Sequence, residues 1–324
     1  MYKKFFGLTR NPFEISPDPY FLFPTARHKE ALASISHGVL RHKGFVVVTG
    51  EVGTGKTLLV RCLLELLRKS NVAFANVFNP GLSPVEFLRY IAFDLGLTTT
   101  DTGKAGLLFA LNNFLISRYH AGLTTVLVVD EAQHLEPEVL EEIRLLTNLE
   151  TTQQKLFQIV LVGQPELEQK LDSPNLRQLK QRIALRCRLE PLDENETRGY
   201  ILRRLERAAA NSQAEATFSD ESLAAIYRFS RGTPRLINTI CENALISAYA
   251  DKCSTVSARV IDEVADDLHI NITLVPPANS PTLTSNAQQA VAKSLLLLIE
   301  SLEKTLRGVE LDSAATEIRL KRFQ

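Results

Sequence analysis

Residues 50–57 carry the pattern that is tied most directly to chemistry. They read Gly-Glu-Val-Gly-Thr-Gly-Lys-Thr, which matches the phosphate-loop motif G-x-x-x-x-G-K-[ST] in full. Glycines let the backbone N–H groups of such a loop curl around a phosphate, and the helix that follows directs its positive N-terminal end at the same anion. Lys56 is then placed to reach the β- and γ-phosphate oxygens, and the Thr57 hydroxyl to bind Mg²⁺. The residues expected to hold a nucleotide are Gly50, Glu51, Val52, Gly53, Thr54, Gly55, Lys56, Thr57 and Leu58.

A second motif supplies two carboxylates. The apolar run Val126–Val129 ends in Asp130 and Glu131, and parallel sheets bind their ligands where the strands end. We expect Asp130 to complete the Mg²⁺ shell and Glu131 to act as the general base toward the attacking water. Together with the phosphate loop, this pair predicts nucleotide hydrolysis.

Three further polar residues narrow the expected reaction site. Gln164 follows the apolar run Phe157–Val162 and places an amide where a γ-phosphate or the lytic water would lie. Arg182 belongs to the basic run 177–188, from which one guanidinium is expected to reach the γ-phosphate of a neighbouring subunit. Arg235 lies in the first turn of an expected helix. The helix dipole favours anions there, so a phosphate is the expected partner of Arg235.

These residues need a parallel sheet to bring them together. Between residues 26 and 191, five β-rich runs alternate with helical patterns, which is typical of a parallel sheet covered on both faces. The runs are 45–49, 72–78, 125–129, 157–162 and 185–189. After residue 191 only helical patterns follow, over 193–210, 219–229, 233–250 and 257–269. The residues from Ser83 to Glu86 and from Asp193 to Glu196 have the spacing of capping boxes at helix starts.

The expected domains follow from this pattern. An α/β nucleotide-binding domain is predicted over residues 26–191, and an all-helical lid domain over residues 192–272. Residues 1–25 are rich in aromatics and prolines without a regular period, which predicts an irregular arm packed on the catalytic core. Residues 273–290 have the composition of a linker. A C-terminal helix is expected over 291–324, with an apolar seam that fits docking on its own domain as well as self-association.

Composition excludes several classes of protein. Of 324 residues 45% are hydrophobic, and the 37 Lys and Arg equal the 37 Asp and Glu, so globular domains without a strong overall charge are expected. No apolar run approaches the roughly 18 residues that a membrane span needs, so direct membrane insertion is not expected. The four scattered cysteines are expected to be reduced, buried thiols of a cytoplasmic protein.

Taken together, these features resemble the AAA+ ATPases. The resemblance rests on the phosphate loop, the Asp-Glu strand, the polar strand end, the arginine before the last strand and the Gly-Thr-Pro-Arg helix start. It implies that Gln164 is the sensor-one residue, Arg182 the arginine finger and Arg235 the sensor-two residue. It also implies an α/β P-loop NTPase fold followed by a helical lid, and turnover of ATP with Mg²⁺ in a homo-oligomeric ring or filament.

Several phrases are similar to the ExeA-type (general secretion pathway protein A) ATPases over roughly residues 1–270. These are Phe5-Phe-Gly-Leu8, Asn11-Pro-Phe13, Pro17-Asp-Pro19, Asp130-Glu-Ala-Gln133, Leu145–Glu150, Val162–Glu166 and Gly232–Asn238. Members of that type carry a membrane span and a peptidoglycan-binding domain after the ATPase portion, where this sequence has a linker and a short helix. The resemblance implies assembly or remodelling of a partner complex related to secretion or the cell envelope, with an unidentified protein client contacted through the C-terminal helix.

Soluble relatives of the same module look like transposition regulators of the TnsC and TniB kind. A DNA-binding AAA+ regulator, assembled on duplex DNA, is therefore the alternative function. Its contact surface would be the basic stretches Arg177–Arg188 and Arg198–Arg207, which also fit solvated helix faces paired with Glu194 and Glu206. A small-molecule kinase fits less well, because the carboxylate pair and the lid arginine suit attack by water. A scaffold without turnover fits less well, because the phosphate loop and both carboxylates are intact.

Overall fold

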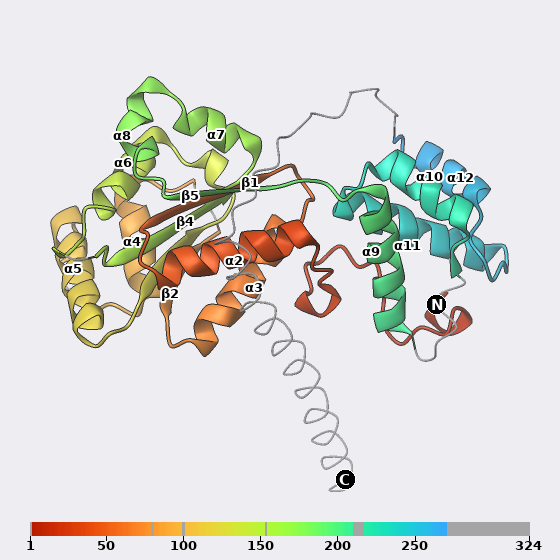
Figure 1. Ribbon diagram of the computed structural model, residues 1–324, viewed down its shortest axis with the longest axis horizontal. Coiled ribbons are helices and arrows are strands. Elements are labelled where there is room, and N and C mark those ends of the chain that lie inside the picture. The colour runs from red at the N-terminus through yellow and green to blue at the C-terminus, as the bar shows by residue number, and fades with distance from the viewer. Residues whose placement is uncertain (1, 79–80, 99–100, 153, 210–216, 271–324) are drawn as a thin grey trace, which may run out of the picture. The chain divides into compact units, whose positions relative to one another are not determined.

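The computed structural model describes residues 2–78, 81–98, 101–152, 154–209 and 217–270 (Figure 1). The expected linker and C-terminal helix lie outside these residues. The helices are α1 Tyr2–Phe5, α2 Ala26–Leu40, α3 Lys56–Lys69, α4 Pro84–Asp94, α5 Lys104–His120, α6 Pro137–Leu146, α7 Pro165–Leu171, α8 Arg177–Lys180, α9 Glu194–Ala208, α10 Asp220–Ser230, α11 Pro234–Ala250 and α12 Ala258–Asp267. The strands are β1 Phe45–Gly50, β2 Ala73–Val77, β3 Thr125–Val129, β4 Phe157–Gly163 and β5 Leu185–Leu189. Within the described ranges, no helix is long and apolar enough to cross a membrane.

The five strands form one parallel sheet in the order β2-β3-β4-β1-β5. Strand β1, which leads into the phosphate loop, lies in the interior of the sheet, where Val47 is opposite both Leu161 and Arg186. Each observed strand agrees with its predicted run to within one residue at either end. The α/β fold predicted from the alternating pattern is therefore confirmed.

Helices cover both faces of the sheet (Figure 1). Helices α2 and α3 pack on one face, against β1, β4 and the two edge strands. On the other face, apolar side chains of the strands share a buried cluster with those of α4 to α8, among them Phe87, Leu111, Leu127, Ile143 and Leu161. The continuous burial of β3 and β4 is what a sheet covered on both faces requires.

Helices α9 to α12 form the helical lid domain around a second apolar cluster. Both predicted capping boxes are present: the side chain of Ser83 bonds the start of α4, and that of Asp193 the start of α9. Each cap satisfies backbone N–H groups that have no partner inside the helix. Helices α9 to α12 begin and end within two residues of their predicted bounds.

The N-terminal arm packs mainly on the lid domain. Its buried Tyr2, Phe6, Phe13 and Phe21 belong to the apolar cluster of the lid. The Tyr2 hydroxyl donates to Glu242 on α11 at 2.7 Å. The physical reason is apolar burial, because these rings complete a core that the short lid helices alone would leave exposed. Only a turn around Pro17 reaches α3, where its carbonyl accepts from the Arg61 guanidinium.

The cysteines also differ in part from expectation. All four are free thiols, and Cys62 and Cys241 are buried, but Cys187 is half-buried and Cys253 is exposed. Cys253 lies in the turn after α11, and such turns run over the surface.

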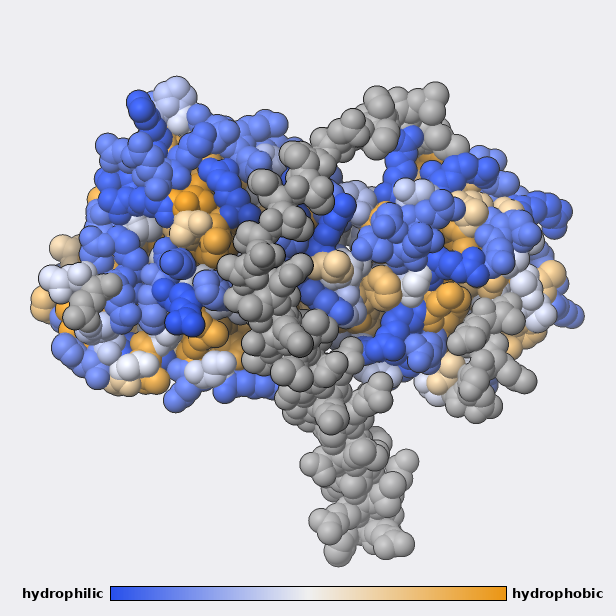
Figure 2. Space-filling view, viewed as in Figure 1, coloured by the Kyte–Doolittle hydropathy of each residue, from blue (hydrophilic) through white to orange (hydrophobic). Residues whose placement is uncertain are grey.

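On the face shown in Figure 2, apolar residues are interspersed among hydrophilic ones.

Gly232, before α11, is expected to be essential for stability. Its φ is +71°, and an added Cβ would lie 1.7 Å from the Leu192 carbonyl oxygen. A backbone oxygen has no flexible end to move, so Gly232→Ala should lower the free energy of unfolding by more than about 2 kcal/mol. Gly122→Ala is the matched control, because Gly122 has φ +67° with open space around it. Urea denaturation of both variants tests this, and equal losses would contradict the steric argument.

Candidate active site

The phosphate loop follows β1 and leads directly into α3. Gly53 and Gly55 have φ values of +82° and +97°, in the left-handed region that glycine adopts without strain. A Cβ at Gly50 would lie 2.8 Å from the carbonyl oxygen of Leu189 on β5. The glycines are therefore required by the backbone path itself, which turns the loop toward the N-terminus of α3.

Lys56 is buried in the first turn of α3. Its Nζ donates to the carbonyl oxygens of Gly50, at 2.7 Å, and Glu51, at 2.9 Å. Burial lowers the pKa of this ammonium group, while the negative charges of Glu131 and Asp130 oppose the shift. The phosphate loop thus holds the largely desolvated Lys56 ammonium group next to the turn that is expected to bind phosphate.

Asp130 lies at the end of β3, next to the start of α3. Its carboxylate accepts from the backbone N–H of Glu131 at 2.9 Å, and the Thr57 side chain is near enough to lower its pKa. The pKa of the carboxyl is raised, chiefly by burial. A buried carboxylate beside a hydroxyl is a set of hard oxygen ligands, which is the chemistry that Mg²⁺ prefers. These two residues therefore fit the predicted metal site.

Glu131 is held by two amides. Its own backbone is in the left-handed region, with φ +52°. Its Oε2 accepts from Gln133 Nε2 at 2.6 Å and from Gln164 Nε2 at 3.4 Å. Gln133 also accepts from the backbone N–H of Gln164 at 3.0 Å, so that one side chain joins the ends of β3 and β4. Gln133 had no predicted role, although it stands in the Asp-Glu-Ala-Gln phrase.

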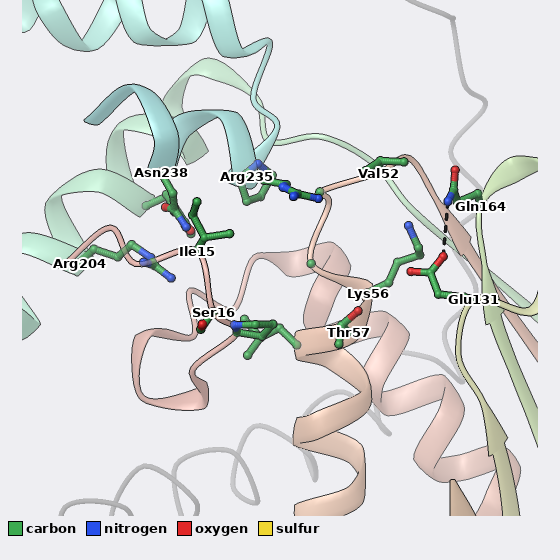
Figure 3. Close-up of a pocket in the computed structure, with 16 residues that line it drawn as sticks. Ile15, Ser16, Val52, Lys56, Thr57, Glu131, Gln164, Arg204, Arg235 and Asn238 are labelled. Atoms are coloured by element: carbon green, nitrogen blue, oxygen red, sulfur yellow. Dashed lines mark hydrogen bonds between the residues drawn. The ribbon is translucent and has the colours of Figure 1, made fainter. Parts of the chain in front are cut away.

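One cavity of about 440 Å³ unites most of these groups (Figure 3). The predicted residues that line it are Val52, Gly53, Gly55, Lys56, Thr57, Leu58, Glu131, Gln164 and Arg235. Gly50, Glu51 and Thr54 belong to the same loop without lining the cavity. The lid touches the loop directly, since the backbone N–H of Arg235 donates to the Gly53 carbonyl at 3.2 Å.

Sequence reasoning missed the other wall of the cavity. It consists of residues from the arm and the lid: Ile15, Ser16, Pro17, Tyr200, Arg204, Pro234 and Asn238. Among the arm residues that line the cavity, only Pro17 belongs to a phrase that the sequence analysis singled out, Pro17-Asp-Pro19. No local motif marks Tyr200 or Arg204, because they join the site only through packing of α9 against α11 and the arm.

Arg182 lies apart from the cavity of its own chain. Its guanidinium donates to the Thr147 hydroxyl at 2.5 Å and to the Arg144 carbonyl at 3.4 Å, both at the end of α6. The side chain is half-buried between α8 and β5. It is thus fixed at the molecular surface, outside the set of residues that surround Lys56.

The two basic stretches have different surroundings. In the second, Arg198 pairs with Asp220, Arg203 with Glu206, and the guanidinium of Arg207 donates to the Tyr20 carbonyl. In the first, Arg186 and Arg188 are exposed on the edge strand β5. Most arginines of the second stretch are therefore used within the fold, whereas the first presents exposed cations.

Comparison with known proteins agrees with this geometry. Residues 39–171 match a family described as an AAA domain. The fold is similar to the ORC2 protein of Aeropyrum pernix, with a TM-score of 0.59 at 17% identity over 80% of this chain and 71% of that one. It is also similar to the Thermotoga maritima RuvB Holliday junction branch migration motor, with a TM-score of 0.51 at 18% identity over 75% and 70%. The family match and these fold similarities agree on an α/β fold of the AAA+ P-loop NTPase kind, with the AAA domain over residues 39–171.

Sequence similarity is more specific. Over 251 residues the chain is 46% identical to General secretion pathway protein A of Aeromonas hydrophila, which covers 77% of this chain and 45% of that protein. The chain is thus similar to the ExeA-type AAA+ ATPases over most of its own length, which supports the resemblance predicted from its motifs. It is also 34% identical over 131 residues to ATP-dependent target DNA activator B of Escherichia phage Mu, over 40% of this chain and 39% of that protein. The chain spans less than half the length of these curated relatives.

Proposed function

We propose that this chain is a Mg-ATP-dependent ATPase whose turnover drives the assembly or remodelling of a partner complex. The observation that carries the proposal is the single cavity in which Lys56, Glu131, Gln164 and Arg235 meet. A buried cation on a glycine loop recognises a triphosphate. A carboxylate and an amide beside it provide what attack by water requires.

Different side chains of the chain carry out different parts of the reaction. Lys56 exchanges its two carbonyl acceptors for β- and γ-phosphate oxygens. Glu131 takes a proton from the water as its oxygen attacks the γ-phosphorus, and the bond to the β-phosphate oxygen breaks to release ADP and phosphate. Gln164 and Gln133, which already bond the Glu131 carboxylate, orient the base. Arg235 stabilises charge on the phosphates from the lid side.

Thr57 and Asp130 would hold the Mg²⁺ ion, which when bound neutralises charge on the β- and γ-phosphate oxygens. The influence of Thr57 on the pKa of Asp130 indicates that the two side chains are close together.

The active site is completed by a second copy of the chain in this proposal. Arg182 is fixed at the end of α6 instead of lining its own cavity, so it is available to a neighbour's γ-phosphate. Nucleotide state is passed to the lid through Arg235, whose backbone bonds the phosphate loop. Similarity to General secretion pathway protein A supports a client related to secretion or the cell envelope.

A DNA-binding regulator is the second candidate function. It is supported by similarity to a protein named ATP-dependent target DNA activator B, and by the exposed Arg186 and Arg188 on β5. The second basic stretch supports it less, since most of its arginines are engaged within the fold. Any DNA contact is therefore expected to involve β5 more than α9, with an affinity that falls as salt rises.

Steady-state ATP hydrolysis tests the proposed function. The purified protein should release phosphate in the presence of Mg²⁺, and Lys56→Ala should reduce that release to background because the triphosphate loses its buried cation. The assay is run with and without duplex DNA at low salt. Strong stimulation that is lost in Arg186→Ala/Arg188→Ala favours the DNA-binding regulator, whereas turnover indifferent to DNA favours the secretion-related assembly factor. Phosphate release that is equal in wild type and Lys56→Ala contradicts both.

A further inference from the structure

Arg204 is a buried cation in the wall of the nucleotide cavity. It lies on α9 and only 4% of its surface is exposed. The side chain lines the cavity and extends toward Ile15 and Ser16 of the arm (Figure 3). Sequence similarity and motif spacing assigned no role to this position.

The surroundings of Arg204 leave its charge incompletely paired. Its Nη1 donates to the Pro12 carbonyl of the arm at 2.5 Å. The rings of Phe21 and Tyr200 each lie 5.0 Å from the guanidinium carbon. The Tyr200 side chain also interacts with it, but its buried Nε has no hydrogen-bond partner within the described ranges. A buried guanidinium without a carboxylate is costly unless another acceptor meets it.

The position of Arg204 indicates which part of a nucleotide it would meet. Glu131 and Gln164 lie at one end of the cavity in Figure 3, next to Lys56. Arg204 and Asn238 lie at the other end, beyond Arg235. A triphosphate bound by the loop directs its γ-phosphate to the first end, so its base points to the second.

We propose that Arg204 donates a hydrogen bond to a ring nitrogen of the adenine base and thereby contributes to recognition of the nucleotide. This inference rests on the proposed function, because the triphosphate must first be bound by the phosphate loop. An arginine has only donors, and the N1, N3 and N7 atoms of adenine are acceptors without a proton of their own. The same guanidinium bonds the arm through Pro12, so recognition of the base would also secure the arm on the lid.

Binding of base-modified nucleotides tests this pairing. The dissociation constants of ATP and of its 1-deaza, 3-deaza and 7-deaza analogues are measured by titration calorimetry with wild type, Arg204→Met and Arg204→Gln. In wild type, at least one analogue should bind about 10-fold or more weakly than ATP, as expected for loss of a hydrogen bond to a charged donor. In both variants that difference should fall below about threefold, because the charged guanidinium is gone: methionine has no donor, and the glutamine amide is neutral and shorter.

Controls separate base recognition from a structural role. General damage to the pocket would weaken binding of ATP and of its analogues equally, and would leave the ratio of their dissociation constants unchanged. Arg204→Gln keeps an N–H that can bond Pro12, so it preserves contact with the arm. Arg203→Met is the matched control, since Arg203 pairs with Glu206 on the outer side of the same helix. It should retain the wild-type ratio.

Three results would overturn the inference while ATP binding stays intact. They are an unchanged ratio in both Arg204 variants, no analogue that binds wild type more weakly than ATP, and a ratio altered only for 2′-deoxy- or 3′-deoxy-ATP, which would place the contact on the ribose. Failure of wild type to bind ATP at all would instead overturn the proposed function, and this inference with it.

Discussion

Glu131→Gln is expected to lower ATP turnover by about 10²- to 10⁴-fold while ATP binding is retained. Glutamine keeps the size and the hydrogen-bonding capacity that Gln133 and Gln164 require, but it cannot accept the proton of the attacking water. Phosphate release under single-turnover conditions measures the chemical step, and titration calorimetry measures binding.

Glu138→Gln is the control for this substitution. Glu138 is exposed in the first turn of α6, away from the cavity, so its turnover should match wild type. If Glu131→Gln releases phosphate within a few-fold of the wild-type rate, Glu131 is not the general base.

Arg182→Ala is expected to reduce turnover at least about 100-fold, with ATP affinity nearly unchanged. Its guanidinium lies outside the cavity of its own chain, and in the proposed shared site it stabilises only the charge that develops in a neighbour's site. Arg177→Ala, in the same basic run but exposed, should behave as wild type.

Mixing the two inactive variants gives the sharper test of a shared site. A Glu131→Gln subunit supplies an intact Arg182, and an Arg182→Ala subunit supplies an intact Glu131. If sites form between subunits, a mixture of the two should recover a substantial fraction of wild-type turnover. A mixture no more active than its components, or full turnover by Arg182→Ala alone, would rule out the arginine finger.

Local spacing determined much of the fold and the central part of the site. The phosphate loop requires glycines within eight residues, and the carboxylates directly follow a buried strand. Periodicity alone located all five strands, because continuous apolar runs between amphipathic helices have few other solutions. The capping boxes at Ser83 and Asp193 are equally local, since a cap joins residues only three apart.

The tertiary structure alone decided the contacts between distant segments. The arm was predicted to pack on the ATPase core, and the structure shows its contacts with the lid, where Tyr2 bonds Glu242 and Phe13 packs on Phe218. The reason is that the lid helices have apolar surface that they do not cover themselves. The role of Gln133 likewise appears only in the tertiary structure, because its side chain bonds the backbone of Gln164, which follows a different strand.

The position of Arg204 in the nucleotide cavity could not be predicted from the sequence either. In sequence it is one of several arginines on an apparently solvated helix, and its neighbours Arg203 and Arg207 bond elsewhere. Burial against Pro12, Phe21 and Tyr200 makes it part of the nucleotide cavity. The sequence by itself determines which groups can bind a triphosphate, because one short loop and the strand ends carry them. Which groups surround the rest of the ligand depends on packing between segments nearly two hundred positions apart, which no local pattern encodes.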